Sequence, residues 1–184
     1  DNRYELYVNG EFVCLGPAWS DLLHWRFESV DIAPFLQPGK NVIAARVVNF
    51  GDQRAVSQFS YKTGFLMQGN SETESIVNTN LDNWRVIKSE AYQPIPIDWR
   101  VFPYYYATFS CDTFKVAKHV HQWQKPDFDD SNWLKPAPIG YNRKGTPRGG
   151  GHLFSDQSGW LLVPRNIPLL TDQRQRFAEV ERTE

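Results

Sequence analysis

A short hairpin signal near the beginning of this 184-residue chain constrains its fold more than any other feature. Two runs rich in apolar and aromatic residues, 4–8 (Tyr-Glu-Leu-Tyr-Val) and 11–15 (Glu-Phe-Val-Cys-Leu), flank the dipeptide Asn9-Gly10. Asn and Gly tolerate the positive φ angles of a type I′ turn, whose twist matches that of two paired strands. The sequence therefore predicts an antiparallel hairpin with a two-residue loop.

A two-residue loop also predicts which residues lie opposite one another in this hairpin, because side chains alternate between its two faces. One face is expected to contribute to the hydrophobic core. The predicted pairs are Leu6–Val13 and Tyr4–Leu15 on the core face and Tyr7–Phe12 on the other face.

Short strand signals recur along the rest of the chain, bounded by turn-forming residues. Residues 41–50 are apolar on both faces, which predicts a central strand of a sheet. Residues 31–36 predict a single helical turn capped by Asp31, with Phe35 and Leu36 buried. The further predicted strands are 59–67, 74–78, 84–87, 104–109, 114–123 and 160–163.

The number and spacing of these signals decide the fold class. Many short strands and no long amphipathic helix predict an all-β domain. We expect an antiparallel β-sandwich of the jelly-roll kind, with a loop-rich C-terminal part over residues 125–160. Two similar turns, 82–84 and 129–133, each end in a Trp that is expected to plug an open end of the sandwich.

Charge and hydropathy exclude two classes of partner. The chain has 20 Lys and Arg against 21 Asp and Glu, so no excess of positive charge is available to hold nucleic acid. No apolar run reaches the roughly 18 to 20 residues that span a bilayer, so no membrane contact is expected. Cys14 and Cys111 are too few for a disulfide framework, and whether they pair stays open.

The sequence offers no diagnostic spacing for catalysis, and we expect no catalytic residue, metal site or cofactor in this chain. His119 and His121 either share a half-exposed strand face, which we favour, or place two imidazoles on one metal. Asp129 and Asp130 are favoured as turn-capping residues over a catalytic carboxylate pair. The basic, glycine-rich segment 144–152 is interpreted as a surface loop or as a loop that reaches over a neighbouring domain's cleft.

Aromatic residues are unusually frequent, at seven Trp, eight Tyr and twelve Phe, or 15% of the chain. A β-rich core built from large flat side chains explains this composition. The alternative is a surface that stacks aromatic rings on the C–H faces of sugars, although we favour the core. Both interpretations stay open.

Several stretches together resemble a known family. They are Tyr4 to Gly10, Gly16-Pro17, Asp31-Ile32 with Leu36, and Gly39 to Ile43. This series is similar to the galactose-binding-like β-sandwich at the front of bacterial α-L-rhamnosidases of glycoside hydrolase family 78. The similarity continues in the turns 82–84 and 129–133 and in the exit segment 160–168. Related motifs also occur in β-galactosidase-like and β-glucuronidase-like enzymes.

The resemblance implies an accessory role. In such rhamnosidases, acidic residues on an (α/α)6 barrel further along the polypeptide carry out inverting hydrolysis, so this chain is expected to be a piece cut from a bacterial enzyme that removes terminal rhamnose from glycans. Residues 1–163 would form the accessory β-sandwich, and residues 164–184 an exit segment toward the missing barrel, its expected partner. The family implies a periplasmic or extracellular location and a role in polysaccharide degradation.

Two other functions remain as alternatives. The first is a free-standing carbohydrate-binding module, with carbohydrate as the partner and Trp19, Trp25 and Trp123 as the candidate binding residues. The second is a structural spacer with neither sugar affinity nor activity.

Overall fold

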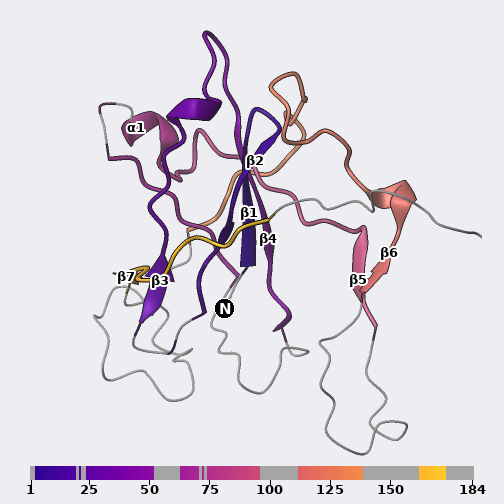
Figure 1. The fold of residues 1–184 in the computed structure, drawn as a ribbon. Helices are drawn as coiled ribbons and strands as arrows, with labels where there is room; N and C mark the ends of the chain where they lie inside the picture. Colours follow the sequence, from indigo (N-terminus) through magenta and orange to yellow (C-terminus); the bar gives the residue numbers. More distant parts are fainter. Residues whose placement is uncertain are drawn as a thin grey trace, which may run out of the picture.

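The computed structural model describes residues 3–19, 21, 24–51, 63–70, 72, 74–95, 112–138 and 162–172 (Figure 1). Most of its elements are short strands, with almost no helix, as expected for an all-β chain. They are β1 (Arg3–Val8), β2 (Glu11–Gly16), β3 (Trp25–Phe27), the 3-10 turn η1 (Ala33–Phe35), β4 (Ile43–Val48), α1 (Glu74–Val77), β5 (Tyr92–Pro94), β6 (Asp112–Phe114), the 3-10 turn η3 (Val116–Lys118) and β7 (Leu162–Pro164). None of the described helices is long and apolar enough to cross a membrane.

The predicted hairpin is confirmed. Strands β1 and β2 pair antiparallel, and the turn residues Asn9 and Gly10 have φ angles of 53° and 87°. The Asn9 side chain also joins this turn to the rest of the fold, because it accepts a hydrogen bond from the Val42 amide and donates one to the Phe35 carbonyl, both at 2.9 Å. Asn9 therefore both forms the turn and anchors it to residues more than 20 positions away.

The predicted register of the hairpin is correct next to the turn, where Tyr7 faces Phe12, and wrong beyond it. A bulge between the Leu6 and Tyr7 pairings adds one residue to β2 and shifts the later pairs by one position. The resulting pairs are Leu6–Cys14, Glu5–Leu15 and Tyr4–Gly16, in place of the predicted Leu6–Val13 and Tyr4–Leu15.

The shifted register suits the side chains that it brings together. Cys14 becomes a core residue with 2% of its surface exposed. At position 16 a Cβ atom would lie only 2.4 Å from the Tyr4 ring, so the glycine allows the ring to cross the strand. Cys14 and Gly16 are therefore both closely packed in the shifted register.

The largest sheet has the order β2-β1-β4, with β1 in the centre, and all its described pairs are antiparallel. The prediction that the 41–50 run forms a central strand is therefore wrong for the described sheet, in which β4 pairs only with β1. Ala44 is buried on one face of β4, and Ala45 lies opposite Leu6 on the other. The apolar pattern of the run does not determine how many strands flank β4.

The described core is small and centres on this sheet. Its buried residues are Leu6, Val8, Cys14, Ala18, Trp25, Ala44 and Ala91. The helical turn predicted at 31–36 is present as η1, and Asp31 accepts the Ala33 amide at 2.9 Å. The predicted burial of Phe35 and Leu36 is wrong, because Phe35 is half-buried and Leu36 is 48% exposed.

Within the described residues, neither 63–67 nor 84–87 forms a strand, apart from an isolated bridge between Val86 and Leu134, and two further strand predictions are wrong. Residues Glu74–Val77 form the short helix α1, closed by a 2.9 Å hydrogen bond from the Asn78 amide to the Glu74 carbonyl. In the 114–123 run only the end of β6 is a strand, and η3 follows it. The predicted strand 104–109 and parts of the strands predicted at 59–67 and 160–163 lie outside the described residues.

The two Trp turns predicted from the sequence lie side by side. Val86 and Leu134, shortly after Trp84 and Trp133, exchange backbone hydrogen bonds of 2.8 and 3.0 Å. Both Trp side chains are half-buried, and Trp84 donates its indole N–H to the Asn78 carbonyl at 3.1 Å. Whether these turns close the end of a sandwich stays a prediction, since the described sheets are small.

Candidate functional site

The structure separates the three Trp residues predicted to contact sugar. Trp19 is 53% exposed, and the Arg3 guanidinium lies 4.7 Å from the centre of its ring. Trp123 is half-buried, with its ring edge-on to Tyr7 at 5.6 Å. Arg3 and Tyr7 are four positions apart on β1, about 13 Å along a strand. Trp19 and Trp123 therefore lie at opposite ends of β1.

Trp25 is the least accessible of the three. It is the first residue of β3, opposite Leu162 of β7, and only 8% of its surface is exposed. A sugar ring needs an open aromatic face, so this position is the least suited to stacking. Contact between sugar and any of the three Trp residues stays a prediction.

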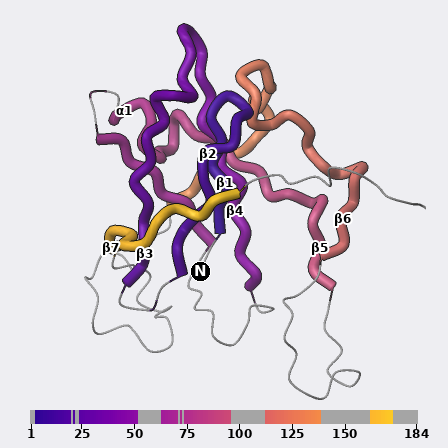
Figure 2. The backbone as a smooth tube through the Cα atoms, in the orientation of Figure 1, coloured from indigo at the N-terminus to yellow at the C-terminus, as the bar shows by residue number. Residues whose placement is uncertain are grey.

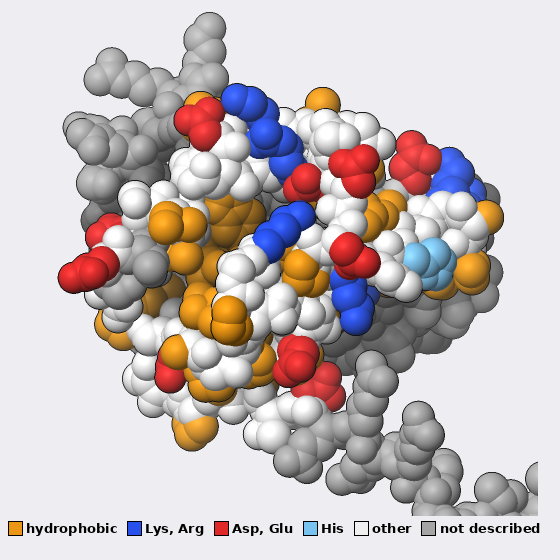
Figure 3. Space-filling model, turned by 90° about the horizontal axis from the view of Figure 1, so that it is seen from above, with side chains coloured by type: hydrophobic (Ala, Val, Ile, Leu, Met, Phe, Trp, Pro, Cys, Tyr) orange, Lys and Arg blue, Asp and Glu red, His pale blue; other side chains and the backbone are white. Residues whose placement is uncertain are grey.

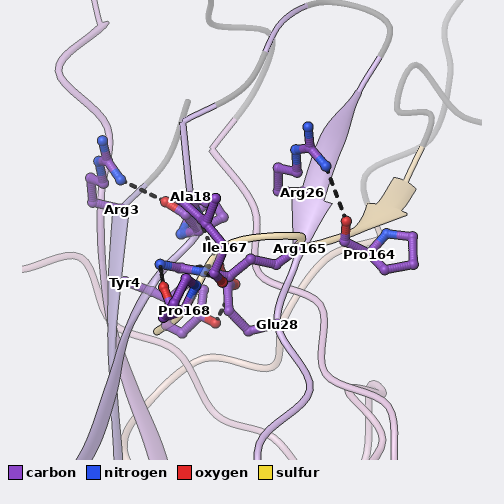
Figure 4. Close-up of polar contacts among 10 residues, drawn as sticks. Arg3, Tyr4, Ala18, Arg26, Glu28, Pro164, Arg165, Ile167 and Pro168 are labelled. Carbon is purple, nitrogen blue, oxygen red and sulfur yellow. Dashed lines mark hydrogen bonds and ion pairs between the residues drawn. The ribbon is translucent and has the colours of Figure 1, made fainter. Parts of the chain in front are cut away.

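A buried cluster of polar groups joins the start of the chain to its predicted exit segment (Figure 4). We call Tyr4, Ala18, Glu28 and Arg165 the buried exit cluster. The Glu28 and Arg165 side chains are only 1% and 5% exposed and lie 3.0 Å apart as an ion pair. The Glu28 carboxylate also accepts hydrogen bonds of 2.8 Å from the Tyr4 hydroxyl and from the Ala18 amide. Three separate segments of the chain thus contact one carboxylate.

The exit segment is fixed by backbone contacts as well. Strands β3 and β7 pair in parallel, and the Arg165 amide donates to the Phe27 carbonyl at 2.9 Å. The Arg165 side chain also donates to the carbonyls of Ile167, at 2.9 Å, and Pro168. Figure 2 shows the 162–172 segment in yellow, running beside β3 and then crossing toward the β2-β1-β4 sheet. Residues 162–168 are therefore held beside β3 by both backbone and side-chain contacts.

Burial shapes the electrostatics of this cluster. It raises the pKa of Tyr4, with the nearby Glu28 charge adding to the effect, and it raises the pKa of the Cys14 thiol. It lowers the pKa of Arg3, against the opposing effect of Glu28. The Glu28 and Arg165 side chains are almost closed to solvent and satisfy one another, so the buried exit cluster holds segments together and offers no binding surface.

A second polar cluster lies on the other face of β1, where it remains open to solvent. We call Glu5, Tyr7, Arg46, Tyr92 and Trp123 the outer-face cluster. Glu5 and Arg46 are opposite each other on β1 and β4, and their side chains form an ion pair of 2.5 Å. Tyr7 donates its hydroxyl to Glu5 at 2.6 Å, and Arg46 donates to the Tyr92 hydroxyl at 3.0 Å.

Two members of the outer-face cluster, Tyr7 and Arg46, have raised pKa values. Burial and the hydrogen bond to Glu5 raise the pKa of Tyr7 to about 12. Burial lowers the pKa of Arg46, but the hydrogen bond and charge of Glu5 outweigh it and leave that pKa raised. The side chains of Glu5 and Arg46 are 25% and 39% exposed, so a ligand can reach both charges.

Aromatic rings extend the outer-face cluster along β5 and β6. The Tyr92 and Phe114 rings are 5.0 Å apart, Phe114 meets His119 at 5.3 Å, and His119 meets His121 edge-on at 4.7 Å. The two histidines follow η3 in place of the predicted strand. No group of three or more His, Cys, Asp or Glu in the described residues could hold a metal ion.

Figure 3 shows acidic and basic side chains interspersed over the described part of one face, with hydrophobic groups between them. Ion pairs between neighbouring side chains, such as Lys118–Glu90 at 2.5 Å, occur among the described residues. The predicted turn capping by Asp129 is confirmed, because its carboxylate accepts the Ser131 amide at 3.0 Å. Hydrogen bonds from the Ser131 side chain and, second, from the Ser131 amide lower the pKa of Asp129.

Sequence reasoning missed both clusters. The outer-face cluster had a signal, since Arg46 interrupts an apolar run and Glu5 and Tyr7 alternate with core residues along a predicted strand. The buried exit cluster had none, because Glu28 and Arg165 are single charged residues 137 positions apart. Cys14 is a free, buried cysteine, and Cys111 lies outside the described residues.

Comparison with known proteins decides the family. The model of the α-L-rhamnosidase N-terminal domain matches residues 2–146. The chain belongs to this family. No curated protein and no solved structure gives a significant match. The rhamnosidase resemblance predicted from the hairpin and the Asp31-Ile32 stretch is therefore confirmed.

The rhamnosidase family match covers one of the two clusters completely and the other in part. It spans all five residues of the outer-face cluster, together with Glu28. It ends before Arg165, the partner of Glu28. The structure therefore links the matched domain to a segment beyond the match through a buried ion pair.

Proposed function

We propose that this chain serves as a non-catalytic accessory domain of a polypeptide whose catalytic part hydrolyses terminal rhamnose from glycans. The observation that carries the proposal is the match of the α-L-rhamnosidase N-terminal domain over residues 2–146. The catalytic part is expected to be an (α/α)6 barrel of the same polypeptide, and its location periplasmic or extracellular.

The buried exit cluster supports this accessory role. A domain that positions a neighbour needs a fixed exit, and Arg165 fixes the exit segment through Glu28 and the Phe27 carbonyl. The division into a β-sandwich over 1–163 and an exit segment over 164–184 is part of the proposal. In such an arrangement the domain would pack against the barrel and help to shape its sugar site.

Two measurements test the accessory role. The isolated chain should not hydrolyse an aryl α-L-rhamnoside, and turnover that survives repurification would overturn the proposal. An antibody raised against the chain should detect a native polypeptide several times larger than 21.3 kDa in the source cells. A native product near 21.3 kDa would contradict the accessory role.

A free-standing carbohydrate-binding module is the second candidate, favoured by the 53% exposure of Trp19. This function requires saturable quenching of Trp fluorescence by a glycan. The quenching should disappear when one of the three residues Trp19, Trp25 and Trp123 is replaced by Ala. Quenching that persists in all three variants would remove these residues from consideration.

A further inference from the structure

The outer-face cluster retains unused hydrogen-bonding capacity at the surface. A guanidinium has five N–H donors, and the described contacts of Arg46 use one nitrogen toward Glu5 and the other terminal nitrogen toward Tyr92. The Tyr92 hydroxyl accepts from Arg46 and keeps its own proton to donate. Each Glu5 oxygen accepts one of these hydrogen bonds and keeps a lone pair. Donors and acceptors therefore lie together.

These polar groups are already oriented. Glu5 fixes Arg46 across the β1–β4 pair, and Tyr7 fixes Glu5 at 2.6 Å, with Trp123 packed edge-on behind Tyr7. Since the side chains are held by their neighbours, a ligand does not have to order them, and less conformational entropy is lost on binding. The cluster is therefore preorganised for binding.

An aromatic surface adjoins the polar groups. Tyr92 and Phe114 are 39% and 45% exposed, and their rings are 5.0 Å apart. A pyranose ring presents an apolar C–H face next to hydroxyl groups that both donate and accept. Exposed rings beside a mixed donor and acceptor array match both properties.

Charge decides which kind of sugar fits. Arg46 is paired with Glu5, so the cluster has no unpaired positive charge among its five members, and an anionic group would meet the Glu5 carboxylate. A neutral sugar forms hydrogen bonds with both partners without displacing either. The cluster is therefore better suited to neutral pyranosides than to uronic acids or phosphates.

We propose that the outer-face cluster is a binding subsite for a neutral pyranoside, with Arg46 and Tyr92 donating to its hydroxyls, Glu5 accepting from them, and Phe114 against its C–H face. The choice of a terminal α-L-rhamnoside as the ligand rests on the proposed function. The subsite itself rests on the geometry of the cluster.

The test is a titration of the full chain with methyl α-L-rhamnopyranoside, followed by NMR chemical shifts of backbone and Arg side-chain N–H groups. We expect saturable shifts centred on Arg46 and Tyr92. Tyr92→Phe keeps the ring and removes the donor, and it should weaken binding about three- to tenfold, the effect of one lost hydrogen bond. Phe114→Ala should also weaken binding.

Arg46→Met should weaken binding at least as much as Tyr92→Phe. Its matched control is Arg85→Met, because Arg85 is also partly buried but donates to the local carbonyls of Asp82 and Trp84. This control should bind like the unmodified chain. If Arg46→Met fails to fold, the milder Tyr92→Phe variant and the exposed Phe114→Ala variant decide the outcome.

The outcomes separate the subsite from the proposed function. Binding of a different neutral pyranoside, weakened by Tyr92→Phe and Phe114→Ala, would support the subsite and reject rhamnose as its ligand. Absence of saturable binding across a panel of neutral pyranosides, or unchanged affinity in both variants, would overturn the subsite. The accessory role would be unaffected, since the activity and native size measurements decide it.

Discussion

The Glu28 carboxylate and the Arg165 guanidinium lie 3.0 Å apart in the interior, although 137 positions separate them in the chain. Tyr4 and Ala18 donate to the same carboxylate, so the pair connects the first strand, the segment after the hairpin and the exit segment. Removing one partner of a buried pair leaves an uncompensated charge, which makes this contact far more sensitive to substitution than an exposed ion pair.

Substitution Glu28→Gln should therefore lower the free energy of unfolding by about 3 kcal/mol, because it leaves the Arg165 charge buried without its partner. Urea unfolding followed by Trp fluorescence measures this change. Asp82→Asn is the matched control, since the Asp82–Lys135 pair has side chains 85% and 62% exposed and should contribute little. Equal effects of the two substitutions would show that the pair does not hold the exit segment.

The centre of the hydrophobic core gives a second prediction. Val8 is fully buried on β1, so Val8→Ala removes two methyl groups from a packed interior and should cost about 2 kcal/mol. Val116→Ala provides the control, because Val116 is 64% exposed and its truncation should change stability by less than about 0.5 kcal/mol. Similar unfolding midpoints for the two variants would contradict the position of the core.

The outer-face cluster predicts a loss of stability at alkaline pH. The pKa of Tyr7 is about 12 in the folded chain against 10.0 ordinarily, so the unfolded chain releases this proton first. The stability that the protonated Tyr7 hydroxyl adds to the folded chain is fully present below pH 10. It is lost as the pH rises from about 10 to 12. Unfolding measured between pH 9 and 12 should show a shallower decline for Tyr7→Phe than for the unmodified chain. An identical decline would exclude Tyr7 as its source.

Reactivity of Cys14 gives a fourth prediction. Burial raises the pKa of this thiol, and the side chain is 2% exposed, so the reactive thiolate is both scarce and inaccessible. In a Cys111→Ser variant, iodoacetamide at pH 8 should modify Cys14 at least tenfold more slowly in buffer than in denaturant. Mass spectrometry follows the reaction, and rapid modification of the folded chain would contradict burial of Cys14.

Local chemistry explains what could be predicted. The Asn9-Gly10 turn, the capped turn at 31–36 and the Asp129 turn each depend on side chains within a few residues, and all three are present. The short helix α1 marks a limit, because a β-branched run preceded by Glu74 satisfies either a strand or a helical turn. The contacts of Asn78 with Glu74 and Gly69 favour the helical turn here.

The sequence by itself determined the hairpin, the strand-rich character and the rhamnosidase family, because turn chemistry and residue order carry these features. Only the tertiary structure decided the bulge that selects Cys14 over Val13, the central place of β1, and the pairing of Glu28 with Arg165. The physical reason is that each of these depends on packing between distant segments, where one residue of shift or one buried partner changes the energy by several kcal/mol. The same holds for the outer-face cluster, whose members come from four separate parts of the chain.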